Sequence, residues 1–231
     1  MRLRLALRSG WQAARSNFVP GLILQAAMLV FLTAYLSHDG FRDFLDRVAV
    51  VRREMDYGFA FLSNIFAGAV LPEILRIVVF QKGRISKVNV VGILTVAPVW
   101  GVMGVVVDFF YRCQLAWFGD SVAPLVILTK VAVDQFIYSP FFSNPVINAY
   151  LTWRQAGFRS CALDEIFSSA FVFDRLLPAQ MAGWTVWIPG VSLVYFMPPL
   201  LQMPVAVLIG CFWSLILTSI QDNARTRYPA V

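Results

Sequence analysis

Three pairs of oppositely charged residues lie inside otherwise apolar sequence. The members of each pair are three or four residues apart, so both side chains fall on one face of a helix. The pairs are Glu73/Arg76, Asp108/Arg112 and Lys130/Asp134, and Gln135 follows the last of them. A charged side chain in hydrocarbon costs about 2.5–3.5 kcal/mol on insertion scales, so it needs a partner or water. Two interpretations stay open: the pairs line an aqueous pathway, or they only hold helices together.

The chain contains no recognisable catalytic motif, since it lacks GxSxG, a P-loop and a dinucleotide fingerprint. Its one histidine, His38, has no nucleophile partner in its neighbourhood. Its cysteines, Cys113, Cys161 and Cys211, are far apart and form no CxxC spacing. We therefore expect no enzymatic activity, no cofactor, no metal site and no disulfide framework.

The composition indicates which kind of structure positions the charged pairs. Apolar residues make up 59% and charged residues 14% of the chain, whereas an average soluble domain is about 25% charged. The mean hydropathy is +0.70. The net charge is +6, but the basic residues form short clusters between apolar runs. This pattern fits the positive-inside rule, and it lacks the dense basic tract that is typical of nucleic-acid binding. The fold class we expect is an all-α integral membrane helical bundle.

Apolar stretches predict four to six transmembrane helices. They cover about residues 18–37, 57–80, 88–111, 122–153, 166–198 and 204–220. The second stretch contains Pro72 and predicts a kinked helix, and the fourth exceeds one span, so we expect a break near Pro140 and Pro145. Basic residues in the loops place both termini on one side of the membrane if all six stretches cross it.

The segments before residue 57 differ from the rest. Residues 1–17 are basic and contain no acid, which fits either a mitochondrial presequence or an anchor beside the first span. Residues 37–56 predict an interfacial amphipathic helix, with Phe41, Phe44, Leu45, Val48 and Val51 opposite a charged face that includes Arg52. We divide the chain into a basic segment (1–17), a first span with an amphipathic helix (18–56), a helical bundle (57–221) and a tail (222–231).

A further pattern combines tryptophan, proline and other aromatic residues. Trp184, Trp187 and Pro189 are followed by Tyr195, Pro198, Pro204 and Trp213. These residues are compatible with an aromatic belt at the headgroup level. Upstream of them stands Lys130-x3-Asp134-Gln135-x4-Pro140, itself preceded by Ala97-Pro98, Gly101 and Gly104. In this order, over about residues 90–220, the elements resemble the family of Mpv-seventeen and twenty-two-kilodalton peroxisomal membrane proteins. Gly183, Val191, Val194 and Gln202 depart from the polar residues usual there.

The resemblance implies a small channel-like protein of the mitochondrial inner membrane or the peroxisomal membrane, which passes small hydrophilic solutes. Lys130, Asp134 and Gln135 are the best-matched polar positions. Two alternatives stay open: a proton-coupled carrier that uses Asp134 or Glu73 as its proton-binding carboxylate, and a non-transporting membrane scaffold. The partners we expect are the lipid bilayer and small hydrophilic solutes. The sequence is also compatible with a homo-oligomer, and we expect no nucleic acid as a partner.

Overall fold

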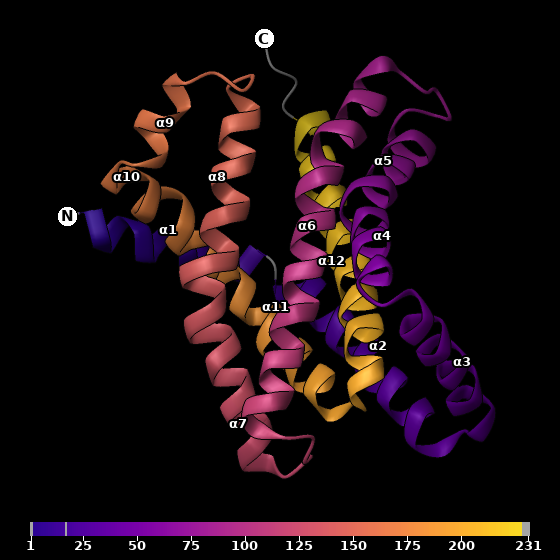
Figure 1. Ribbon diagram of the computed structural model, residues 1–231. Coiled ribbons are helices and arrows are strands. Elements are labelled where there is room, and N and C mark those ends of the chain that lie inside the picture. Colours follow the sequence, from indigo (N-terminus) through magenta and orange to yellow (C-terminus); the bar gives the residue numbers. More distant parts are fainter. Residues whose placement is uncertain (1, 17, 228–231) are drawn as a thin grey trace. The chain divides into compact units, whose positions relative to one another are not determined.

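The computed structural model describes residues 2–16 and 18–227 and contains no strand in that part of the chain (Figure 1). Helix accounts for 89% of it. The α-helices are α1 (Arg2–Ser16), α2 (Phe18–Ser37), α3 (Asp39–Met55), α4 (Tyr57–Ile65), α5 (Leu71–Leu75), α6 (Lys87–Phe118), α7 (Pro124–Val133), α8 (Asn144–Gln155), α9 (Cys161–Ile166), α10 (Ser169–Phe171), α11 (Leu177–Phe196) and α12 (Pro199–Arg227). Four π-helical segments join some of them: η1 (Phe66–Val70), η2 (Arg76–Phe80), η3 (Asp134–Ser143) and η4 (Val172–Leu176).

Four helical runs are long and apolar enough to cross a membrane. They are Phe18–Ser37, Tyr57–Phe80, Lys87–Phe118 and Pro124–Gln155. The all-helical expectation is therefore confirmed, with four helices of spanning length among the described residues. The fifth and sixth expected stretches do not reach that standard: α11 is not among the four, and the apolar part of α12, Pro199–Leu215, is shorter.

Proline changes the hydrogen bonding of two of these runs without interrupting them. The expected break near Pro140 and Pro145 is wrong, because α7, η3 and α8 form one continuous helix. Pro140 lacks the N–H that would bond to a carbonyl four residues earlier. It lies inside η3, where π-helical i→i+5 bonding rearranges the ladder around that gap. The run that contains Pro72 is likewise continuous, with η1 before the proline and η2 after it.

The described residues pack into two compact units, which follow a different division from the linear segments expected above. Unit 1 comprises Met1–Phe31 and Ser121–Phe196, and unit 2 comprises Leu32–Asp120 and Met197–Val231. Helix α2 begins in unit 1 and ends in unit 2.

Unit 1 is organised around α11. Helix α1 packs against it, and the contact is close at Gly10, where a Cβ would meet the side chain of Met181. Gln25 on α2 donates a side-chain hydrogen bond of 3.0 Å to the Thr185 carbonyl oxygen. Segments α7, η3 and η4 also contact α11. This packing brings the polar residues of the η3 run against the aromatic residues of α11.

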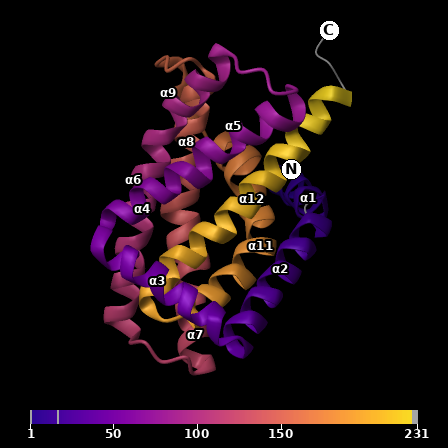
Figure 2. The same ribbon diagram turned by 90° about the vertical axis from the view of Figure 1, so that its right-hand side faces the viewer.

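Unit 2 is organised around the contact of α4 with α6. Gly104 permits it, because a Cβ there would overlap the Ala60 carbonyl oxygen and the Asn64 side chain. Helix α12 runs past α3 and also contacts α4, α5 and α6 (Figure 2). The Ser214 hydroxyl donates 2.8 Å to the Ala67 carbonyl oxygen in η1. Two of the three polar clusters described below, those of Asp108 and Glu73, lie in this unit.

Candidate functional site

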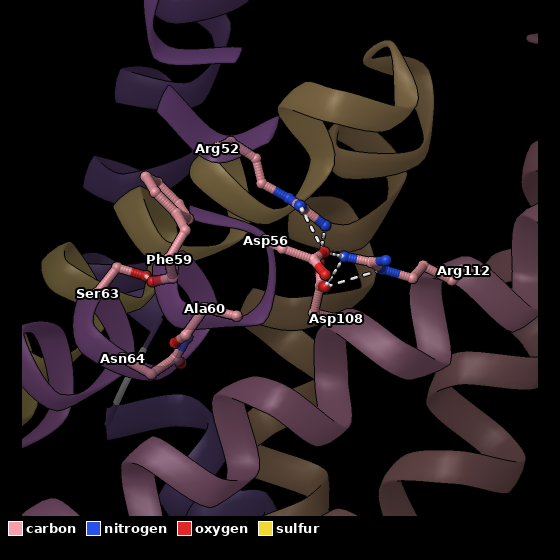
Figure 3. Close-up of polar contacts among 8 residues, drawn as sticks. All are labelled: Arg52, Asp56, Phe59, Ala60, Ser63, Asn64, Asp108 and Arg112. Atoms are coloured by element: carbon pink, nitrogen blue, oxygen red, sulfur yellow. Dashed lines mark hydrogen bonds and ion pairs between the residues drawn. The ribbon is translucent and has the colours of Figure 1, made fainter. Parts of the chain in front are cut away.

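Asp108 on α6 lies between two arginine side chains in unit 2 (Figure 3). Arg52 on α3 donates 2.5 Å to one carboxylate oxygen, and Arg112 donates through Nε 3.0 Å to the other. Asp56 completes the group, because Arg112 bonds to it and Arg52 lies 3.7 Å from it. Asp108 is 2% and Arg52 6% exposed. The expected pair is therefore part of a four-residue cluster that joins α3, α4 and α6.

The sequence-based placement of Arg52 on the charged face of the amphipathic helix is wrong. Arg52 belongs to the buried face of α3 with Leu45 and Ala49, whereas Phe44 and Val51 are exposed. The buried face is rotated from the apolar stripe because α3 packs against other helices with only part of that stripe. The spacing of Arg52 from Leu45 fits this face, but no local signal shows that its carboxylate partner comes 56 residues later.

The backbone at Asp56 is strained. Its φ of 50° and ψ of −126° lie outside the regions that residues with a side chain ordinarily adopt. The hydrogen bond from Arg112 lowers the pKa of the Asp56 carboxyl from its ordinary value of 3.8. The Arg112 guanidinium also lies 4.2 Å from the ring centroid of Tyr57. Charged and aromatic contacts thus hold the strained corner between α3 and α4.

Glu73 takes part in a second cluster of unit 2. Arg76 bonds to one of its carboxylate oxygens, and the Asn89 amide donates 2.8 Å to the other. The Asn89 side-chain oxygen accepts 2.9 Å from the backbone N–H of Ser86 and so forms part of the capping box of α6. Glu73 is 7% exposed. The expected Glu73/Arg76 pair is formed, and Asn89, which sequence reasoning missed, connects it to α6.

Unit 1 holds the third cluster. The Tyr195 hydroxyl donates 2.7 Å and the Gln135 amide 2.8 Å to the two carboxylate oxygens of Asp134. Trp184 donates 2.9 Å through its indole nitrogen to the Gln135 carbonyl oxygen. The Lys130 ammonium lies 5.7 Å from the centroid of the Tyr195 ring, within cation–π range. Lys130, Asp134 and Gln135 are 2%, 5% and 4% exposed.

This arrangement unites two parts of the sequence pattern. Trp184 and Tyr195 from the aromatic pattern meet the Lys130 to Gln135 element, and their separation of 49 and 61 residues hid the contacts from sequence reasoning. The other members of the pattern contribute no hydrogen bond to this cluster among the described residues. Trp187 and Pro189 lie on α11, Pro198 follows it, and Trp213 lies on α12.

The chemistry available in these clusters is that of fixed charges and hydrogen bonds. Within residues 2–16 and 18–227, no group of three or more histidine, cysteine, aspartate or glutamate side chains could hold a metal ion. Each cluster combines side chains from different helices, so each fixes helix packing. The Asp134 cluster also places uncharged donors on a buried carboxylate.

The interpretation of these clusters depends on their own geometry. A scan against protein-family models and searches of curated proteins and of solved structures found no match to this chain.

Proposed function

We propose that the chain is an integral membrane protein that passes small hydrophilic solutes, with the pathway next to η3 and α11 of unit 1. The observation that carries the proposal is the buried group of Lys130, Asp134 and Gln135 within a helical run of spanning length. Ionisable side chains at that depth are expensive, and apolar residues would pack the same helices at lower cost. An ionisable group inside a membrane span is therefore a functional candidate by default.

Two further features support this location. Asp134 is the first residue of η3, a π-helical segment of ten residues, and π-helical turns are frequent at functional sites. The same three polar residues are those that best match the channel-like family that the sequence resembles. By that resemblance the membrane is the mitochondrial inner membrane or the peroxisomal membrane. The alternation of apolar and charged residues along α3 separately favours a place for this helix at the membrane interface.

A solute could use the proposed pathway only after a rearrangement. The hydrogen bonds to Asp134 come from Tyr195 and Gln135, and the buried cluster presents little polar surface to a solute. A solute that passes must exchange with at least one of these donors. The Tyr195 hydroxyl is the candidate to move, because it comes from another helix, whereas Gln135 neighbours Asp134 in the chain.

Solute flux through the purified chain tests the proposal. Planar-bilayer recording should show a conductance above the lipid background, and liposomes that contain the protein should show solute flux. Asp134→Asn should change both the conductance and the flux, because it removes the fixed charge. Asp120→Asn is the matched control, because it makes the same chemical change at an exposed residue outside η3. Absence of conductance where a control porin conducts would refute the proposal. Flux that requires a pH gradient and disappears in Asp134→Asn would identify a proton-coupled carrier instead.

A second candidate is a non-transporting scaffold, favoured by the complete pairing of Asp108 with Arg52 and Arg112. Such a cluster serves helix packing without any solute. This candidate predicts that Asp134→Asn lowers stability while wild-type protein shows no flux, and that crosslinking in membranes recovers a stable partner.

A further inference from the structure

A hollow of about 580 Å³ opens beside the turn that connects η2 to α6 in unit 2. It is lined by Phe80, Gln81, Lys82, Arg84 and Ser86. One run of spanning length ends at Phe80 and the next begins at Lys87. Because both runs have an end here, the hollow lies at the level of the lipid headgroups when these helices cross a bilayer.

The charge around the hollow is positive. Lys82, Arg84 and the neighbouring Lys87 are exposed. Among the described side chains, none of these three bases forms an ion pair with an acid. The nearby acid, Glu73, is buried and already bonded to Arg76. An anion in the hollow would therefore meet cationic side chains that no acid among the described side chains pairs with.

The turn that carries these bases is fixed. Lys82 and Gly83 have φ values of 53° and 80°, so two successive residues adopt the left-handed region. The Gly83 N–H donates 2.7 Å to the Ile77 carbonyl oxygen, and the Arg84 N–H donates 3.0 Å to that of Gln81. A residue with a side chain in this region is unfavourable by itself. The backbone bonds therefore hold Lys82 at the hollow at some conformational cost.

Exposed apolar side chains flank the same turn. They are Val78 and Val79 on η2, Ile85 in the turn, and Val88 and Val91 on α6. Their exposed fractions lie between 55% and 77%. In water, the exposure of these apolar side chains would be unfavourable, whereas in a membrane they would contact acyl chains. The structure thus pairs a cationic hollow with an apolar strip, which matches a molecule that has both an anionic head and hydrocarbon tails.

We propose that this hollow binds the phosphate headgroup of an anionic phospholipid, whose acyl chains lie along the apolar strip of Val78, Val79, Ile85, Val88 and Val91. The inference depends on the membrane insertion assumed in the proposed function, but not on solute transport. A neutral phospholipid offers the same chains without a net negative head, so the hollow selects for headgroup charge. The contact is electrostatic at its head and weakens as salt rises.

Lipid retention by the full-length protein tests the inference. Protein purified from mixed phosphatidylcholine and phosphatidylglycerol vesicles should retain phosphatidylglycerol in excess, and Lys82→Gln with Arg84→Gln should weaken that binding about 30-fold. This change corresponds to about 2 kcal/mol, at roughly 1 kcal/mol per basic residue and ~1.4 kcal/mol per factor of ten. Lys82→Arg with Arg84→Lys keeps the charge and should keep the preference.

The matched control is Arg47→Gln with Arg53→Gln, which removes the same charge from exposed positions of α3. An equal loss in this control would show a general charge effect and overturn the inference. Competition by inorganic phosphate without lipid preference would identify a free-phosphate site and overturn the lipid assignment. Wild-type protein that passes solutes but retains no excess of phosphatidylglycerol would contradict this inference alone. Wild-type protein that retains phosphatidylglycerol in excess but passes no solute would contradict only the proposed function. A chain extracted from membranes by alkaline carbonate would overturn both.

Discussion

The buried bond between Arg52 and Asp108 should dominate the stability of unit 2. Asp108→Asn keeps the side-chain shape but removes the charge that faces Arg52 at 2.5 Å. The Arg52 side chain is only 7% exposed, so it would retain a poorly compensated charge. Breaking a buried pair from one side costs about 3–5 kcal/mol. We expect a loss near the lower end, about 3 kcal/mol, because Asp56 remains 3.7 Å from Arg52.

Arg112→Gln provides the internal comparison. Its side chain is 40% exposed, and removing a solvated partner costs at most about 1 kcal/mol. Arg52→Met combined with Asp108→Leu should cost less than the sum of its single changes, because neither buried charge is then left alone. Unfolding in detergent, followed by tryptophan fluorescence, gives these free energies. Equal losses for Asp108→Asn and Arg112→Gln would refute the assignment of the stabilising contact to the buried bond.

Three other changes test separate contacts. Arg112 lowers the pKa of Asp56, so their contact stabilises the fold at neutral pH. This stabilisation is lost as the pH falls through the lowered pKa and Asp56 becomes protonated. The loss of stability in acid should therefore be shallower in Arg112→Gln than in the wild type. Gly104→Ala should cost about 1–3 kcal/mol in thermal unfolding because its Cβ would overlap α4 backbone, whereas Gly58→Ala, with no atom within 4 Å, should be neutral or stabilising. Tyr195→Phe removes the 2.7 Å hydrogen bond to the η3 carboxylate and should cost about 1.5–3 kcal/mol; an unchanged free energy of unfolding would show that this bond does not stabilise unit 1.

Composition and periodicity were sufficient for the helical class and for the four helical runs of spanning length. Helical content follows from local patterns, and the stretch expected at about residues 18–37 coincides with α2, Phe18–Ser37. The continuity of the run containing Pro140 was not predictable in the same way. Whether a proline breaks a helix or is absorbed by a π-helical segment depends on the neighbours that pack against it, and these come from distant sequence.

The charged pairs show the same limit. Residues three or four apart were correctly placed on common helix faces, as the bonds of Arg112 to Asp108 and of Arg76 to Glu73 show. The partners supplied by other helices were not visible, because sequence spacing contains no information about which helices meet. Arg52 illustrates the consequence: helical periodicity alone assigned it to the charged face, and only tertiary packing made it a buried partner.

The chemistry of the donors distinguishes the clusters by what each is suited to do. Asp108 is held by guanidinium groups, and hydrogen bonds between two charged groups are roughly twice as strong as neutral ones. Asp134, by contrast, accepts its hydrogen bonds from a phenol and an amide. Neutral donors yield more readily to a competing solute or water, whereas the arginines of unit 2 would have to leave a buried carboxylate uncompensated. Under the proposed function, exchange with a solute would therefore be more favourable at Asp134. The Asp108 cluster is better suited to keep α3 against α6, through the bond from Arg52.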